Sequence, residues 1–333
     1  MSRPSASASP SVFLLLFLIY IHIYIHIYIH IYIYIMERIS TAEELRRLND
    51  GECPTPSKPP SQANANANIQ KRHMSRNQEI WNAITMIVTP GFALYFLLSG
   101  SWVLESDKLQ AQEALLVDKS SSHPESFMNM FPFEHQEKCI SSNMFPYLHA
   151  LPPLATICVV LGYLLHSPCS IYYHLMCAFK LKTAPERINH WSRRLDQAMI
   201  HGMAVFINYG ISGSLSYCLA TLVFSFDSAF RLFKPGFRPK SNQVRMLISL
   251  ITTALPVIMN GSHEEFLQLL IIYAISSWIF LAYPFGGYSH GIFHLAMALS
   301  NPLQLSLSTR LLGSQDAIDL AAKCAVLAEV SGL

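Results

Sequence analysis

From residue 81 onward the chain alternates between long apolar runs and short polar segments. Because the hydrocarbon core of a bilayer is about 30 Å thick, a helix needs roughly 20 mostly apolar residues to cross it. Seven runs approach this length: 83–104, 151–179, 195–213, 214–230, 244–260, 266–283 and 288–311. The pattern predicts an all-α integral membrane protein, with a seven-helix transmembrane domain over residues 81–311.

Basic side chains gather in every second connecting segment. Three precede the first run, and the segments 180–194 and 231–245 carry five Lys or Arg each. The segment 105–149 instead holds seven acidic residues against three lysines, and the short turn near residue 263 holds Glu264 and Glu265. Since Lys and Arg beside membrane spans are retained on the cytoplasmic side, we expect a cytoplasmic N-terminus and a lumenal or extracellular C-terminus.

Composition supports the membrane interpretation. Hydrophobic residues make up 51% of the 333 residues and charged residues 13%, against about 25% in soluble domains. The mean hydropathy of +0.30 and net charge of +2 exclude an acidic disordered chain and a strongly basic nucleic-acid-binding protein. The seven cysteines are odd in number, lie mostly in apolar runs and form no CxxC pair, so we expect buried hydrophobic side chains rather than a disulfide framework.

The N-terminal region has a different pattern. Within residues 1–35, Ile alternates with His or Tyr in the run IYIHIYIHIYIHIYIYI, a period of two that gives no helix face. A helix would place His22, His26 and His30 four residues apart, where they could bind a metal, but a low-complexity repeat explains the run better. It is either a signal anchor or a translated nucleotide repeat ahead of a start at Met36. Residues 36–80 are predicted to be a disordered cytoplasmic tail, and residues 312–333 a C-terminal tail.

Polar residues within the predicted spans are candidates for function, because ionisable groups are costly in a membrane. Ser170 and His174 lie four apart near the end of the second run, and Asp196 lies at the start of the third. His290 and His294 lie four apart near the start of the seventh. The predicted orientation brings all five to the cytoplasmic side.

Three imidazoles at one depth suit a catalytic zinc site. Zn²⁺ in such sites takes three protein ligands and leaves a fourth position for water. We therefore predict Zn²⁺ held by His174, His290 and His294. Asp196 would orient the water and accept its proton, and Ser170 would hydrogen-bond a carboxylate, a ligand or the substrate.

Other polar residues of the runs have structural interpretations. His166 is expected to be a packing or helix-contact residue, and His201 to face away from Asp196. Asp227 is expected to pair with Arg231, four residues further along the same helix.

The segments SIYYH (170–174), RRLDQAMI (193–200) and HGIFH (290–294) together resemble the signature segments of the hemolysin III and progestin/adipoQ receptor families. Both belong to the CREST superfamily of seven-span membrane hydrolases, and the resemblance covers about residues 80–310. It implies the same zinc ligands, with Asp196 and Ser170 supporting the metal-bound water. The chain departs from the family at Gln197, where His or Tyr is commoner, and at His201, where an aromatic residue is usual.

Activities associated with that superfamily are amide hydrolysis, notably of ceramides, and reception of lipid hormones. We therefore expect a zinc-dependent membrane hydrolase of lipid amides or esters, whose partners are the membrane and a lipid substrate or ligand, and no nucleic acid. The alternative is a seven-span lipid or steroid receptor with a structural zinc. A membrane-perturbing or scaffold protein ranks last, because no run offers a polar channel face.

Overall fold

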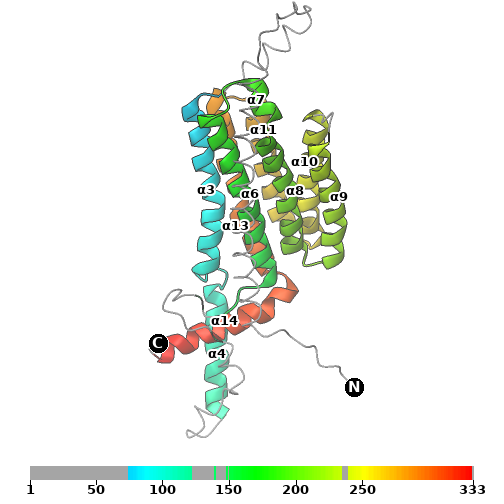
Figure 1. Ribbon diagram of the computed structural model, residues 1–333. Coiled ribbons are helices and arrows are strands. Elements are labelled where there is room, and N and C mark those ends of the chain that lie inside the picture. Colours follow the sequence, from blue (N-terminus) through cyan, green and yellow to red (C-terminus); the bar gives the residue numbers. More distant parts are fainter. Residues whose placement is uncertain (1–73, 122–138, 140–147, 149, 235–238, 332–333) are drawn as a thin grey trace, which may run out of the picture. The chain divides into compact units, whose positions relative to one another are not determined.

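The computed structural model describes residues 74–121, 139, 148, 150–234 and 239–331, and every regular element among them is a helix (Figure 1). The longer helices are α3 (Arg76–Leu98), α4 (Glu105–Ser121), α6 (Leu154–Phe179), α8 (Trp191–Ser212), α9 (Leu215–Phe233), α10 (Pro239–Met259), α11 (His263–Ala282) and α14 (Leu312–Ser331). The shorter ones are α7 (Ala184–Asn189), α12 (Ser289–Ala298), α13 (Ser300–Thr309) and the 3₁₀ turn η2 (Gly286–Tyr288). The predicted all-α class is confirmed, whereas the N-terminal repeat with its three histidines lies outside the described residues.

Within the part of the chain that the structure describes, four helices are long and apolar enough to cross a membrane, which is consistent with a membrane protein. They are α3, α6, α11 and the part of α10 over Ser241–Met259. The seventh predicted run is not one continuous helix, because α12 ends at Ala298 and α13 begins at Ser300. The third, α8, carries Arg193, Arg194 and Asp196 in its first two turns.

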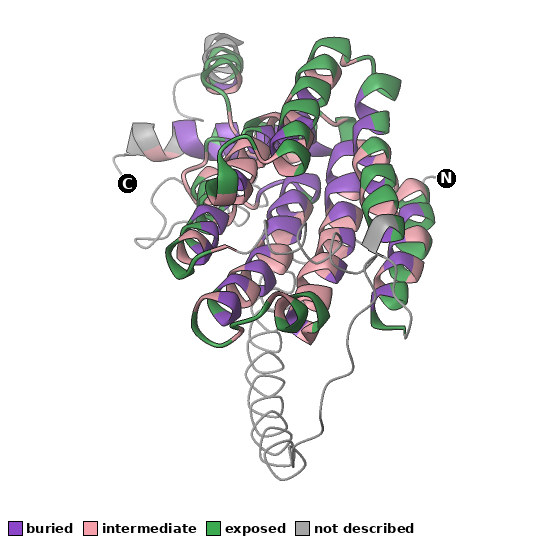
Figure 2. Ribbon diagram, turned by 90° about the horizontal axis from the view of Figure 1, so that it is seen from above, coloured by how far each residue is buried: buried purple, intermediate pink, exposed green. Residues whose placement is uncertain are grey.

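Large apolar side chains on the outer helices are exposed. Val223 and Phe226 of α9 are 72% and 70% exposed, and Trp278 of α11 is 56% exposed. Figure 2 shows the buried sides of the central helices turned toward one another and the exposed sides turned outward. Contiguous apolar faces of this kind are uncommon on soluble monomers, and a lipid environment would solvate them.

Small residues bring the helices around the candidate site close together. At Gly210 of α8 an added Cβ would lie 2.4 Å from the Val159 side chain of α6, so only glycine permits this approach. At Gly291 of α12 an added Cβ would lie 2.4 Å from the Trp81 ring of α3. The two glycines therefore hold α6 against α8 and α12 against α3.

The start of α3 corrects the predicted disordered tail. Ser75 and Gln78 form a capping box, in which each side chain bonds the other residue's backbone N–H. Residues 76–80 are consequently helical, and Glu79 is only 1% exposed. The prediction was wrong here because the helix extends past the last uncharged residue and buries a charged one.

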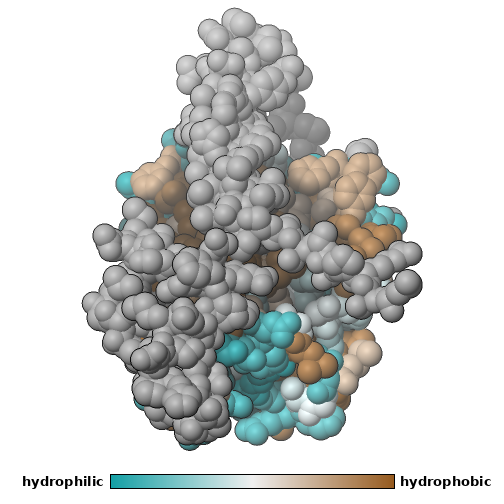
Figure 3. Space-filling model, turned by 90° about the horizontal axis from the view of Figure 1, so that it is seen from below, coloured by the Kyte–Doolittle hydropathy of each residue, from teal (hydrophilic) through white to brown (hydrophobic). Residues whose placement is uncertain are grey.

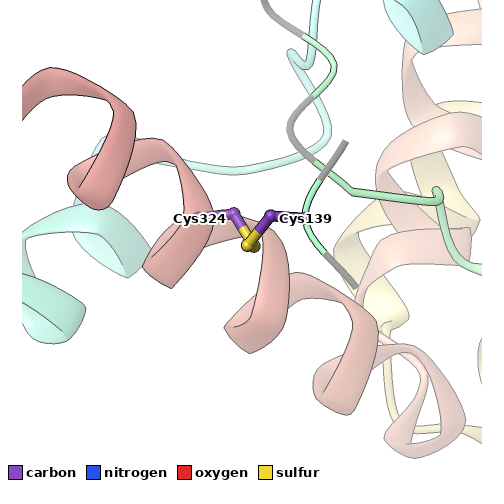
Figure 4. The surroundings of a disulfide bond; sticks show 2 residues. All are labelled: Cys139 and Cys324. Carbon is purple, nitrogen blue, oxygen red and sulfur yellow. A yellow bond between two sulfur atoms is a disulfide. The ribbon is translucent and has the colours of Figure 1, made fainter. Parts of the chain in front are cut away.

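The helices α4 and α14 pack on each other, and a disulfide ties α14 to Cys139. Trp102 lies in a buried cluster with Ile318 and Ala321 of α14, which crosses α4 (Figure 1). Cys139 and Cys324, which are 185 residues apart in the sequence, form this disulfide (Figure 4).

Seen from below, the described part of the surface carries hydrophilic side chains beside apolar ones (Figure 3).

The disulfide overturns the prediction that the cysteines are only buried apolar side chains. The other described cysteines are free and lie within helices. Cys169 and Cys177 are buried as expected, whereas Cys158 and Cys218 are only partly buried. The pairing could not be predicted, because the two partners are 185 residues apart and the total number of cysteines is odd.

A three-histidine candidate metal centre

Three imidazoles from two helices meet at one end of the bundle. His174 lies near the end of α6, and His290 and His294 lie one turn apart on α12. One ligand atom from each ring lies within 4.8 Å of the other two. The ring centroids are 4.5 Å apart for His290 and His294, and 5.0 and 5.5 Å from His174 to these two. The expected meeting of these three side chains is confirmed.

Two ring nitrogens of this group lack a hydrogen-bond partner among the described residues. They are Nε2 of His174 and Nδ1 of His290, both buried. Leaving a buried polar atom unpaired costs about 1–3 kcal/mol, so native structures seldom do so without a reason. A cation that accepts both lone pairs would remove that cost. An all-imidazole donor set of three suits Zn²⁺ with one open position, so the residues fit the metal that the sequence predicts.

A buried carboxylate orients the first ring. Glu79 Oε2 lies 2.8 Å from Nδ1 of His174. An ionised carboxylate can only accept, so Nδ1–H donates and the lone pair remains on Nε2. This is the outer-shell arrangement that fixes the tautomer of a metal-binding histidine.

The charge of Glu79 is itself compensated. Arg187 donates from Nη1 to Glu79 Oε1 at 3.0 Å, and its other donors bond the backbone oxygens of Met74, Cys177 and Leu181. A buried charge is tolerated when it is paired and hydrogen-bonded in this way. Arg187 of α7 thereby connects the start of α3 to the end of α6, which carries His174.

A hydroxyl on α3 orients the third ring. Thr85 Oγ1 lies 3.2 Å from Nδ1 of His294 and donates its one proton to the Asn82 carbonyl at 2.9 Å. Its oxygen therefore accepts from Nδ1–H of His294. The lone pair of His294 is then on Nε2, as it is in His174.

Asp196 lies beside the histidine group, on α8. Its Oδ1 is 3.2 Å from Nε2 of His166, a residue of α6, and Ser170 is a further hydrogen-bond partner. The side chains of His166 and Asp196 are 13% and 14% exposed. His166 is thus a helix-contact residue, as expected, but its partner is the proposed proton acceptor, which the sequence did not indicate.

The remaining polar residues of the spans are engaged elsewhere, as expected. His201 contacts Ser249 at 3.1 Å and Asn242 at 3.5 Å, both on α10. Asp227 bonds Arg231 through both carboxylate oxygens, at 3.0 and 2.8 Å, and also pairs with Arg245. Neither residue joins the histidine group.

Glu79 and Thr85 were missed at the sequence level. Thr85 lies at the start of the first apolar run. Glu79 precedes this run, in a segment whose charged residues do not fit the pattern of a membrane span. The available signal was spacing: Glu79, Asn82 and Thr85 are three residues apart, so they share one face of a helix.

Comparisons with known proteins leave the chain without an assigned relative. No protein-family model, curated protein or solved structure matches it.

Proposed function

We propose that the protein is a zinc-dependent, multi-pass membrane hydrolase of lipid amides or esters. One observation carries the proposal: a buried group of three histidines whose rings are oriented by Glu79 and Thr85, next to Asp196. Three imidazole ligands leave a coordination position open, which is typical of catalytic rather than structural zinc sites.

The proposed mechanism assigns a role to each side chain. Zinc, when bound to the three histidines, supplies Lewis acidity toward a carbonyl oxygen and makes water more acidic. Asp196 accepts the proton of the attacking water at a carboxylate oxygen and returns it to the leaving amine or alcohol. Ser170 hydrogen-bonds Asp196 and helps to hold its carboxylate in place. Glu79 and Thr85 hold the rings so that their Nε2 atoms face the metal.

A lipid is the substrate class that suits this setting. The helices around the site expose apolar side chains, and we propose that α3, α6, α8, α9, α10, α11 and the broken pair α12–α13 are seven spans. Acyl chains enter such a bundle from the bilayer more readily than soluble metabolites do. The resemblance of the three signature segments to ceramide-hydrolysing families supports an amide bond as the first to test.

We also propose that the histidine group lies on the cytoplasmic side. The basic segment 180–194 joins the end of α6, which carries His174, to the start of α8, and Lys and Arg are retained in the cytoplasm. The Cys139–Cys324 disulfide joins α14, which follows the opposite end of α13. Because disulfides persist in oxidising compartments, this end belongs to the lumen or the cell exterior.

A lipid receptor with a structural zinc is the second candidate. It is favoured by the depth of the site, since the side chains of His174 and Glu79 are 1% and 2% exposed. Such a site would bind zinc equally well without turning over a substrate.

One experiment separates the two candidates. The zinc-loaded protein in detergent is incubated with a panel of ceramides and acyl lipids, and fatty acid release is measured. We expect release by the wild type and at least a hundredfold less by Asp196→Asn, because a positioned general base contributes about 10²–10⁴ in rate. His201→Gln serves as a control for loss of a buried polar group on the same helix. Zinc retention with no release from any lipid would favour the receptor.

A further inference from the structure

Besides Ser170, the helix α6 offers His166 as a partner to Asp196, the proposed proton acceptor. His166, Ser170 and His174 are spaced four residues apart on α6, so they follow one another along neighbouring turns. His166 Nε2 lies 3.2 Å from Asp196 Oδ1. One oxygen of the carboxylate is thereby held by a residue that lies two turns before His174 on α6.

Asp196 has an alternative partner within its own helix. Arg193 lies three residues earlier on α8, a spacing at which oppositely charged side chains pair. The Arg193 guanidinium instead donates from Nη1 to the Ile188 carbonyl at 3.4 Å, a long and therefore weak contact. Without a second donor from α6, the carboxylate is free to turn toward Arg193.

We propose that His166 is a positioning residue for Asp196. As a donor at Nε2, it holds Oδ1 of the carboxylate and leaves the other oxygen to take the proton of the attacking water. The effect of His166 on the reaction rate rests on the proposed hydrolase function. The hydrogen bond between His166 and Asp196 does not depend on that function. His166 neither binds the metal nor touches the substrate.

The test compares two substitutions that differ in one property. His166→Gln keeps an N–H donor of similar reach, and His166→Leu removes it at similar volume. Asp196→Asn is the reference for loss of the carboxylate charge, and His201→Leu is the control for loss of a buried histidine that contacts α10. Each variant is assayed for zinc content, for the visible spectrum of the Co²⁺-substituted protein and for fatty acid release from the lipid panel.

The expected results differ from those of a purely structural role for His166. All variants keep their zinc, because none of the three ligands is changed. His166→Leu lowers kcat about a hundredfold with KM within twofold, as a small displacement of a reacting group does, and His166→Gln recovers most of this loss. The cobalt spectrum, which reports the groups around the metal, changes in His166→Leu as it does in Asp196→Asn, and His166→Gln and His201→Leu retain the wild-type bands.

Two different failures can be told apart. If the wild type releases no fatty acid, the hydrolase proposal fails, and the cobalt spectra still decide whether His166 positions Asp196. If the wild type is active but His166→Leu keeps its kcat and its cobalt spectrum, the positioning role is overturned. A lower melting temperature of His166→Leu with unchanged kcat and spectrum would likewise overturn it, because the pair would then only join α6 to α8.

Discussion

Glu79 of α3 holds the ring of His174 of α6, with Oε2 2.8 Å from Nδ1. The contact joins residues 95 positions apart and makes α3 part of the candidate metal site, although α3 supplies none of the three histidines. Thr85, almost two turns further along α3, does the same for His294 of α12. The orientation of two of the three ligands thus depends on one helix.

Glu79→Gln is expected to weaken zinc binding about 10- to 100-fold, the usual cost of losing an outer-shell partner of a metal-binding histidine. The amide keeps the shape but lowers the strength of the bond to Nδ1–H and leaves Arg187 without its counter-charge. The measurement is zinc affinity by competition with a chelator. Glu113→Gln, on the exposed side of α4, is the matched control. Equal affinities of the Glu79 variant and the wild type would refute the orienting role.

Thr85→Val is expected to weaken zinc binding by a smaller factor. Valine has nearly the same shape but no hydroxyl, and a neutral hydrogen bond contributes about 0.5–1.5 kcal/mol, which corresponds to roughly 2- to 12-fold. Thr85→Ser keeps the hydroxyl and should bind zinc as the wild type does. The same chelator competition measures both. A loss in the serine variant as large as in the valine variant would mean that packing, not the bond to His294, is responsible.

Removing the disulfide should destabilise the fold without emptying the metal site. For a long closed loop, replacing Cys139 and Cys324 by serine should lower the free energy of unfolding by about 2–5 kcal/mol. Thermal unfolding in detergent and zinc content are measured together, with Cys218→Ser, a free cysteine, as the control. Maleimide labelling of Cys139 and Cys324 in the unreduced wild-type protein would contradict the pairing.

The cap of α8 should respond to pH. His190 is the N-cap, and its Nδ1 accepts from the Ser192 backbone N–H at 3.3 Å. Burial lowers the pKa of His190 below its usual 6.5, so the folded protein favours the neutral ring. The contribution of this N-cap to the stability of the fold is therefore complete above about pH 6.5. It is lost as the pH falls below that value, since a protonated ring nitrogen cannot accept the Ser192 N–H.

His190→Asn isolates this effect, because asparagine is a good N-cap that does not titrate. Between about pH 7.5 and pH 5.5 the wild type should lose about 1 kcal/mol more stability than the variant, the usual worth of an N-cap. The measurement is the melting temperature of both proteins at each pH. Identical pH dependence in the two proteins would show that the cap at His190 does not titrate in this range.

The sequence was sufficient to predict the all-α class and the meeting of the three histidines, but not the helices α4 and α14. Long uncharged runs are visible to hydropathy, and His290 and His294 share a face by spacing alone. His174 could be added because the alternation of basic segments brought the ends of α6 and α12 to the same side. Each of these inferences depends on local periodicity or on charge, which a single sequence carries.

What the sequence could not predict depends on contacts between distant helices. Hydropathy places a span's beginning after its last charge, so Glu79 was assigned to a disordered tail even though Arg187 neutralises it in the fold. His166 lies two turns from His174 on α6, and its contact with Asp196 is visible only in the fold, where α8 lies beside α6. The pairing of Cys139 with Cys324 likewise requires the packing of α14.

The most direct test of the account is the metal content of the purified protein. Elemental analysis should find about one zinc per chain in the wild type and in His201→Gln, and less than about one-tenth of an equivalent in His290→Ala, which removes one of the three ligands. Zinc at the same level in His290→Ala as in the wild type, or none in the wild type purified with zinc present, would contradict the claim that these histidines form a metal site.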